Sequence, residues 1–379
     1  MSIQDRMDAP GPKKLLALDG GGIRGMITLE FLAEIESILR QRTGNRADFV
    51  LADYFDYVAG TSTGAIIAAC VAMGMPVQTI TQFYQDNGKA MFDKAGLLRR
   101  FRYKYEDEKL AAKLREVIRQ QTAARPGDAE PTLGTDKLRT LLMMVMRNAS
   151  TDSPWPVSSN PRAKYNQRNR ADCNLDLPLW ELIRASTAAP VYFPPEVVRV
   201  GQKEFIFVDG GLTMYNNPAF ILFLMATVAP YNLGWATGED RLLLVSVGTG
   251  SNPKANENLD PDEMNVLFNA ASVPSALMYA ALNEQDMLCR VFGRCRAGAP
   301  LDREIGDLHG PGGPAEPRLF TYMRYNCELS REALDALGLK HVKPENVQRL
   351  DSIEHMDQLR DVGRTAARRE VRAEHFAGF

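Results

Sequence analysis

Short apolar segments that end directly in a glycine-rich turn recur along the chain. They are Leu15–Leu18 before "DGGG", "YFDYVAG" at 54–60, and "RLLLVSVGTG" at 241–250. Helical patterns follow the first two turns, with apolar residues at helical spacing in 26–41 and small residues in 63–73. Strands that alternate with helices in this way are typical of a parallel sheet with helices on both faces. The sequence therefore predicts an α/β fold, a three-layer sandwich with a mostly parallel central sheet.

Two more segments, "LRTLLMMVMRN" at 138–148 and "FIFVDGG" at 205–211, also have the pattern of strands. The charged and polar stretch from about 95 to 175 interrupts the alternation of strands and helices, and we expect a surface insertion there. We therefore expect the chain to consist of a core over 13–260, which carries this insertion, and a C-terminal helical region over 261–379 that packs on the core.

Composition excludes several classes of protein. The net charge is −2, so no overall basic field favours a nucleic acid polymer as partner. The most apolar run, Ala219–Ala229, is shorter than the roughly 20 residues that span a bilayer. The first residues have no apolar segment like that of a secretory signal peptide, so we expect a cytoplasmic location. The five cysteines form no CxxC pair, which favours buried free thiols over disulfides or a zinc site.

The first glycine turn has two possible uses. Gly20–Gly25 spell GxGxxG between a strand and a helix, which on its own favours a dinucleotide site. Such a site also needs an acidic residue at the end of the second strand, and no acidic residue stands at that place. The amides of Gly20, Gly21 and Gly22 can instead bind an oxyanion at the start of a helix, with Arg24 adding positive potential.

The second turn, "GTSTG", places Ser62 between Gly60 and Gly64. A strand before GxSxG and a helix after it are what a nucleophile elbow requires, because the serine must stand exposed on a tight turn. Small neighbours on both sides let the strand and the helix approach each other. The alternative is a structural turn with a serine that caps the helix.

The third turn follows Asp209, which ends an apolar strand before Gly210 and Gly211. An aspartate that caps a turn is the alternative to a functional one. A Ser-His-Asp triad needs an imidazole near the serine. All four histidines lie after the last clear strand–helix unit, at His309, His341, His355 and His375. An aspartate can serve directly as the base, so a Ser62–Asp209 dyad fits the sequence better than a triad.

In this order, the three sites resemble the patatin-like phospholipases, whose signatures are DGGGxRG, GxSxG and DGG or DGA. They stand here as "DGGGIRG" (19–25), "GTSTG" (60–64) and "DGG" (209–211). Two more segments are similar to that family, "RASTAAPVYFPP" at 184–195 and "LLLVSVGTG" at 242–250. The resemblance covers about residues 13–250 and is weaker over 95–175 and beyond about 260.

The resemblance implies a lipid acyl hydrolase with a Ser-Asp dyad that needs no metal and no cofactor. Ser62 carries over as nucleophile, Asp209 as general base, and the amides of Gly20–Gly22 with Arg24 as the oxyanion hole. The chain looks like compact cytosolic bacterial members, some of which are anti-phage effectors that a cyclic nucleotide switches on. The implied partners are membrane phospholipid, met at the surface of the inner membrane, and a cyclic dinucleotide activator. A homo-oligomer is left open.

Three alternatives stay open. The aromatic and basic stretch at 91–105 is a candidate patch for contact with a membrane, and a charged helix that covers the sheet explains it equally well. A thioesterase or general carboxylesterase would use the same dyad. A regulator that binds a nucleotide at Gly20–Gly25, without hydrolysis, is the rival from another class.

Overall fold

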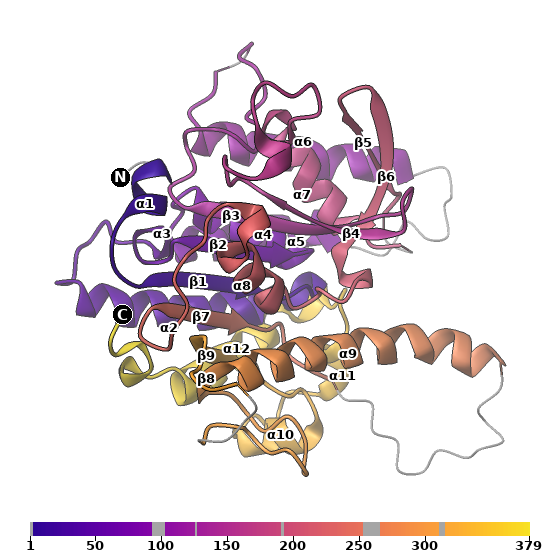
Figure 1. The fold of residues 1–379 in the computed structure, drawn as a ribbon. Helices are drawn as coiled ribbons and strands as arrows, with labels where there is room; N and C mark the ends of the chain where they lie inside the picture. Colours follow the sequence, from indigo (N-terminus) through magenta and orange to yellow (C-terminus); the bar gives the residue numbers. More distant parts are fainter. Residues whose placement is uncertain (1–2, 93–102, 126, 191–192, 253–265, 311–314) are drawn as a thin grey trace.

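The computed structural model describes residues 3–92, 103–125, 127–190, 193–252, 266–310 and 315–379. Within these residues nine strands form one sheet (Figure 1). The strands are β1 (Lys13–Leu18), β2 (Tyr57–Thr61), β3 (Leu141–Asn148), β4 (Ser153–Ser158), β5 (Glu196–Val200), β6 (Lys203–Asp209), β7 (Leu242–Val247), β8 (Gly293–Ala297) and β9 (Phe320–Tyr325). Their order is β5-β6-β3-β2-β1-β7-β9-β8, and β4 pairs with β3.

The strand directions confirm the predicted, mostly parallel sheet. β1 lies in parallel between β2 and β7, so that Leu18 stands beside Gly60 and Val247. β3 extends the parallel part beyond β2, and β9 and β8 extend it beyond β7. β4, β5 and β6 are antiparallel additions on the β3 side. Because parallel strands end at the same edge, the turns after β1 and β2 meet there.

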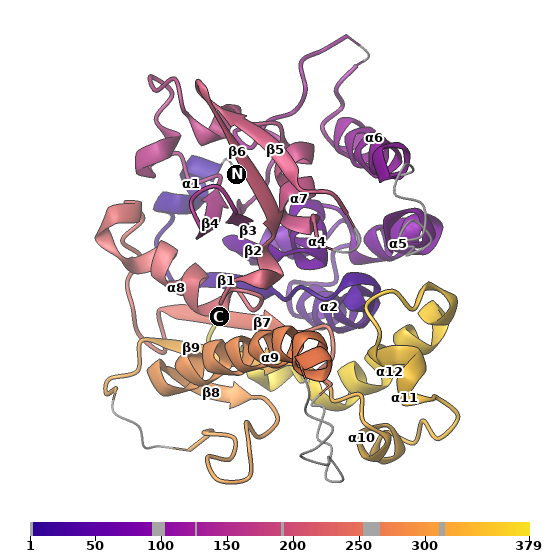
Figure 2. The same ribbon diagram turned by 90° about the vertical axis from the view of Figure 1, so that its right-hand side faces the viewer.

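Helices cover both faces of the sheet (Figure 2). They are α1 (Ile3–Asp8), α2 (Gly25–Arg42), α3 (Leu51–Tyr54), α4 (Thr63–Ala72), α5 (Val77–Phe92), α6 (Tyr103–Gln121), α7 (Leu179–Thr187), α8 (Ala219–Thr227), α9 (Val266–Phe292), α10 (Arg331–Ala336), α11 (Pro344–Gln348) and α12 (Met356–Glu370). α2, α4, α5, α7 and α12 pack on one face, and α8 and the last turns of α9 on the other. The predicted three-layer α/β sandwich is confirmed.

β1 shows why the sheet can be covered on both sides. Its residues Leu16 and Leu18 belong to the apolar cluster with α2 and α4. Leu15 and Ala17 belong to the opposite cluster, with α8. All four are fully buried, because successive side chains of a strand point to opposite faces. A continuous apolar run is therefore what this central parallel strand needs.

The C-terminal part of the chain differs from the helical region predicted over 261–379. It supplies β8 and β9, and every residue of β9 is buried. Without β9, β7 would present an unpaired edge of backbone N–H and C=O groups inside the molecule. α12 packs along α2 on the first face of the sheet. A boundary at residue 260 thus cuts through one sheet and does not separate two units.

The predicted insertion over about 95–175 also contains part of the sheet. β3 is buried at every residue but Arg147 and lies between β2 and β6, and β4 pairs with it. The sequence predicts a strand at this apolar run, 138–148, but the polar residues around it led us to place it within the insertion. α6 and the turns over 159–175 remain outside the sheet, so the insertion is smaller than predicted.

Candidate active site

Ser62 stands on a strained turn between β2 and α4. Its φ of 55° and ψ of −124° are unfavourable for a residue with a Cβ atom. Such a turn is what a nucleophile elbow needs in order to expose Oγ at the end of a strand. The Ser62 amide donates to Oγ of Ser186 at 3.0 Å, and that hydroxyl donates to the carbonyl of Val145 at 2.6 Å. These two bonds fix the turn to α7 and β3.

Gly60 and Gly64 let β2, α4 and β1 approach closely. A Cβ atom on Gly60 would lie 2.0 Å from the carbonyl oxygen of Gly64. One on Gly64 would lie 2.3 Å from the carbonyl oxygen of Leu18. Both obstacles are backbone atoms that a side-chain movement cannot relieve. Packing alone therefore requires glycine at both positions of the GxSxG motif.

Asp209 lies at the end of β6 and faces Ser62. Oγ of Ser62 donates to Oδ2 of Asp209 at 2.6 Å, across 147 positions of sequence. The other carboxylate oxygen, Oδ1, accepts the amide of Gly211 at 2.7 Å. Gly210 passes so close to β3 that a Cβ atom there would lie 2.2 Å from the carbonyl oxygen of Val145. The fold thus brings the two predicted dyad residues into direct contact.

The environment of Asp209 suits a base. Burial raises the pKa of Asp209 to about 6, although the hydrogen bonds from Ser62 and Gly211 oppose this rise. The carboxylate is therefore ionised at neutral pH and holds a proton more readily than an exposed aspartate. Among the described residues, no histidine hydrogen-bonds to either dyad residue; His375 contacts Tyr325 and His309 contacts Asp307.

The glycine turn after β1 lies directly beside the elbow. A Cβ atom on Gly20 would be 3.2 Å from Cβ of Ser62. The Gly20 amide donates to the carbonyl of Asn216 at 3.1 Å, so it is already used, which differs from the prediction that all three glycine amides bind an oxyanion. The amides of Gly21 and Gly22 have no acceptor within the described residues. They are the two donors that this turn can offer.

Arg24 is held by the C-terminal segment. Its Nη1 donates to the carbonyl of Gln348 at 3.3 Å, and the neighbouring amide of Ile23 donates to the carbonyl of Leu350 at 2.9 Å. Burial lowers the pKa of Arg24 to about 10, so it is charged at neutral pH. In this structure Arg24 fixes the glycine turn to the C-terminal segment, and its predicted share in the oxyanion hole remains a prediction.

Side chains that sequence reasoning missed hold the turns together. Oγ1 of Thr249 donates to the carbonyl of Gly20 at 3.0 Å, and Oγ1 of Thr61 donates to the carbonyl of Tyr215 at 2.6 Å. Together with Asn216, these residues connect the turns after β1, β2, β6 and β7. The signal was available in part, because Thr249 stands in the quoted "SVGTG" and Asn216 follows the DGG motif.

A buried ion pair stands immediately before the glycine turn. Arg324, on β9, donates to both carboxylate oxygens of Asp19, at 2.9 and 2.5 Å. Its Nη1 also donates to Oγ of Ser246 at 2.7 Å. Both charged side chains are at most 3% exposed, and Asp19 raises the pKa of Arg324. The C-terminal part of the chain therefore contributes a residue that orients the start of the glycine turn.

Other predicted features have varied outcomes. All five cysteines are free and buried, as predicted. The predicted membrane patch falls largely outside the described residues, including its arginines Arg99, Arg100 and Arg102. In the part of the chain that the structure describes, no helix combines the length and apolar character needed to cross a bilayer. No group of three metal-ligating side chains occurs in that part either.

Comparison with known proteins gives consistent relatives. The family model described as patatin-like phospholipase matches residues 16–223. Patatin-2-Kuras 4 of Solanum tuberosum is 28% identical over 267 residues, which are 66% of this chain and 65% of the relative. Patatin-17 of Solanum cardiophyllum is 29% identical over 255 residues, 62% of this chain and 60% of the relative. The chain thus matches just under two thirds of the length of these relatives.

Two solved structures are similar at a low level. VipD from Legionella pneumophila has a TM-score of 0.35 at 15% identity, over 94% of this chain and 68% of that one. Human GIVD cytosolic phospholipase A2 has a TM-score of 0.42 at 12% identity, over 97% of this chain and 62% of that one. Neither score is high enough to add to the fold described above. The family model matches more than half of the 379 residues, and this protein belongs to the patatin-like phospholipase family.

Proposed function

We propose that this protein is a lipid acyl hydrolase of the phospholipase A type, which cleaves ester-linked fatty acids from membrane glycerophospholipids. The observation that carries the proposal is the 2.6 Å hydrogen bond from Oγ of Ser62, on its strained turn, to the buried carboxylate of Asp209. Gly21 and Gly22, on the turn that approaches Ser62 at Gly20, have unpaired amides of the kind that an ester hydrolase needs for the developing oxyanion. Membership of the family supports lipid as the substrate class.

The first half of the reaction forms an acyl-enzyme. Asp209 accepts the proton of Ser62 while Oγ attacks the ester carbonyl carbon. The carbonyl oxygen becomes negative and receives the N–H groups of Gly21 and Gly22; loss of one such donor costs about 100- to 1,000-fold in rate. The bond to the alcohol oxygen then breaks. That oxygen takes the proton from Asp209 and leaves as a lysophospholipid.

The second half releases the fatty acid. A water molecule gives a proton to Asp209 and attacks the acyl carbon on Ser62, which forms a second tetrahedral oxyanion at the same amides. Its collapse breaks the bond to Oγ, which recovers the proton from Asp209. Because burial raises the pKa of Asp209 to about 6, the form that can accept a proton predominates above that pH.

The proposal extends to the biological setting. We include a peripheral location at the inner membrane and activation by a cyclic dinucleotide in anti-phage defence. What supports this part is the likeness to compact bacterial members of the family. A thioesterase or general carboxylesterase with the same dyad is the alternative for the substrate.

The test is release of fatty acid from mixed phospholipid liposomes by the wild type, S62A and D209A, in EDTA, with and without a panel of cyclic dinucleotides. We expect release by the wild type and a loss of at least about 1,000-fold in each variant. A soluble short-chain ester is assayed in parallel. Faster turnover of that ester than of liposomes would favour the carboxylesterase.

Two further outcomes decide the rest. Dependence of the wild type on one cyclic dinucleotide supports the defence role, and full activity without any of them contradicts it. If the wild type releases nothing under every condition and Ser62 does not react with a fluorophosphonate probe, the hydrolase proposal is wrong.

A further inference from the structure

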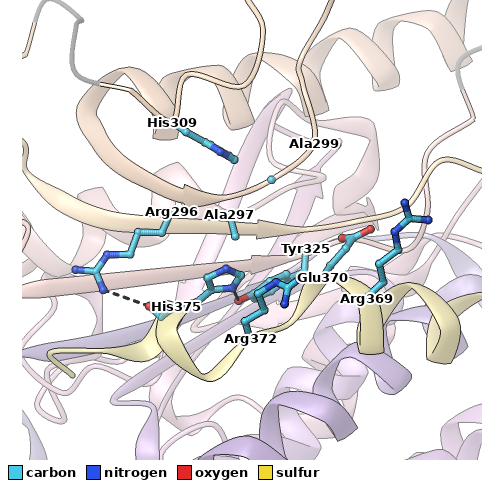
Figure 3. Close-up of a pocket in the computed structure, with 10 residues that line it drawn as sticks. Arg296, Ala297, Ala299, His309, Tyr325, Arg369, Glu370, Arg372 and His375 are labelled. Atoms are coloured by element: carbon cyan, nitrogen blue, oxygen red, sulfur yellow. Dashed lines mark hydrogen bonds between the residues drawn. The ribbon is translucent and has the colours of Figure 1, made fainter.

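A pocket distinct from the candidate active site lies between the end of the edge strand β8 and the chain around the end of α12 (Figure 3). Its volume is about 310 Å³. Ordinary ligand pockets are lined mainly by apolar and aromatic groups. This lining is mostly ionisable, with three arginines, two histidines and one glutamate: Arg296, Arg369, Arg372, His309, His375 and Glu370. No lining residue belongs to the Ser62–Asp209 site, so its chemistry needs a separate explanation.

The three guanidinium groups have no carboxylate partner within the described residues. Nη1 of Arg296 donates to the carbonyls of His375 at 3.2 Å and Ala377 at 2.7 Å. Nη1 of Arg369 donates to the carbonyl of Ala336 at 3.0 Å. Arg372 forms no hydrogen bond or ion pair with another described residue. Carbonyl groups orient a guanidinium without cancelling its charge, so the pocket has an excess of positive charge.

Among the lining residues Glu370 is the one acidic group, against three arginines. Burial raises the pKa of Glu370 to about 7, so this carboxyl is close to half protonated at neutral pH. Asp307 is 3.3 Å from Nδ1 of His309 and is engaged there. Glu374 is exposed beside His375. A protonated Glu370 is also a hydrogen-bond donor, which an anion accepts.

His375 adds a donor. Its Nδ1 lies 2.9 Å from the hydroxyl of Tyr325. Burial raises the pKa of Tyr325, so the phenol keeps its proton. The hydroxyl donates to Sδ of Met323 at 3.3 Å, and toward Nδ1 it serves as donor or acceptor according to the tautomer of His375. Nε2 has no hydrogen-bond partner among the described residues, and a bound anion favours the protonated imidazole, which carries a proton on Nε2. Figure 3 shows the imidazole of His375 among the labelled side chains, with Arg372 beside it and His309 across the pocket.

We propose that this pocket binds a small phosphate monoester, held by Arg296, Arg369 and Arg372 and by Nε2 of His375. Guanidinium groups bind phosphate oxygens through charge-assisted hydrogen bonds, often two at a time. The volume lies at the lower end for ligand pockets, which suits one phosphate with a single sugar, base or glycerol group. A free nucleotide and a lipid headgroup share this chemistry. The proposal does not depend on hydrolysis at Ser62.

The test is calorimetric titration at about 0.15 M ionic strength and pH 7 with three probes: inorganic phosphate, glycerol 3-phosphate and adenosine 5′-monophosphate. We expect saturable binding of at least one probe, and a loss of at least about tenfold in affinity in R372E and in R369E. Arg368 is exposed on α12 next to Arg369 but does not line the pocket, so R368E is the matched control. It should change the affinity by less than about twofold. Thermal unfolding checks that each variant is folded.

A second readout comes from NMR of the imidazoles. Burial lowers the pKa of His375, and a bound anion should raise it. Tighter binding of the nucleotide would assign a free nucleotide, and tighter binding of glycerol 3-phosphate a lipid headgroup. Equal binding would mean that the site recognises the phosphate alone. The proposal is overturned by no saturable binding up to about 10 mM of any probe. It is also overturned if R368E weakens binding as much as R372E does.

Discussion

Asp209 must be buried to act as a base, and its burial opposes folding at neutral pH. Its ordinary pKa of 3.8 rises to about 6 in the folded protein. Between these two pH values the folded state therefore binds the proton more tightly than the unfolded state does. The free energy of unfolding falls as pH rises through this window and stays lowered above it. Such a cost is common where a site must hold a destabilised charge.

We predict that D209N is more stable than the wild type at pH 7 to 8 by about 1–3 kcal/mol, since a shift of one pKa unit corresponds to about 1.4 kcal/mol. The amide keeps the shape of the carboxylate without its charge. The gain should vanish at about pH 2 to 3, where the wild-type carboxyl is protonated in both states. Urea unfolding curves at several pH values measure it.

Asp136 provides a matched control, because its side chain is 84% exposed. D136N should leave the stability unchanged within about 0.5 kcal/mol at every pH. A D209N variant that is destabilised equally at pH 3 and pH 8 would show that the hydrogen bonds of Asp209, not its charge, dominate its effect on folding.

At the scale of single residues, the sequence revealed the candidate site residues that stand in a short recognisable motif. Ser62 stands in GxSxG, Asp209 precedes two glycines, and Gly21 stands in the glycine turn. Ser186 stands in the quoted segment 184–195, but nothing there shows its partner, which is 124 positions away; Arg324 stands in no motif, and its partner is 305 positions away. Their roles follow only from strand order, which brings β3, β1, β7 and β9 together. A single sequence does not state that order.

At the scale of elements, β9 supplies part of the candidate active site. Arg324 lies on this strand and binds Asp19, the residue directly before Gly20. A guanidinium that binds both carboxylate oxygens fixes direction as well as distance. A lysine has the charge without the planar, two-pronged geometry. Arg324 is therefore expected to act as a positioning residue for the glycine turn.

We predict that R324K lowers kcat by about 10- to 100-fold with KM changed less than about threefold, because the oxyanion donors lose their alignment. R324M should lose about 3–5 kcal/mol of stability, because it leaves Asp19 buried without a partner. Steady-state kinetics and urea unfolding measure the two effects. The double variant D19N/R324M should recover much of the stability and none of the activity.

That last result separates positioning from folding. Recovery of stability and activity together in the double variant would mean that the pair serves only the fold. Arg294, on β8, pairs with Glu239 at the surface, where its partner is half exposed. R294M is the control and should change the stability by less than about 1 kcal/mol.

At the scale of the whole molecule, the sequence predicted the layers and the parallel sheet better than the boundaries. β1, β2 and β7 are continuous apolar runs, which periodicity detects well. β9 reads "FTYMRY" and β8 reads "GRCRA", and their polar residues are buried or half-buried through long-range partners. Average polarity therefore made the last third of the chain look like a separate helical region. It is a part of the same core.

One consequence is that the predicted core over 13–260 should not fold alone. A fragment of residues 1–252 ends after β7 and lacks β9, whose backbone pairs with β7 along its length. It also lacks Arg324, which leaves Asp19 buried without its partner, and α12, which covers α2. We predict an insoluble or molten fragment that gives no cooperative unfolding transition and no labelling of Ser62 by a fluorophosphonate.

Co-expression of residues 1–252 with residues 266–379 is the matched control, since it makes the same break and supplies both pieces. The exposed edges of β7 and β9 are complementary, so the two fragments should assemble and regain labelling of Ser62. Size-exclusion chromatography and the fluorophosphonate reaction check this. A soluble 1–252 fragment that unfolds cooperatively and reacts at the wild-type rate would restore the two-unit division, and would also show that Arg324 is dispensable for the glycine turn.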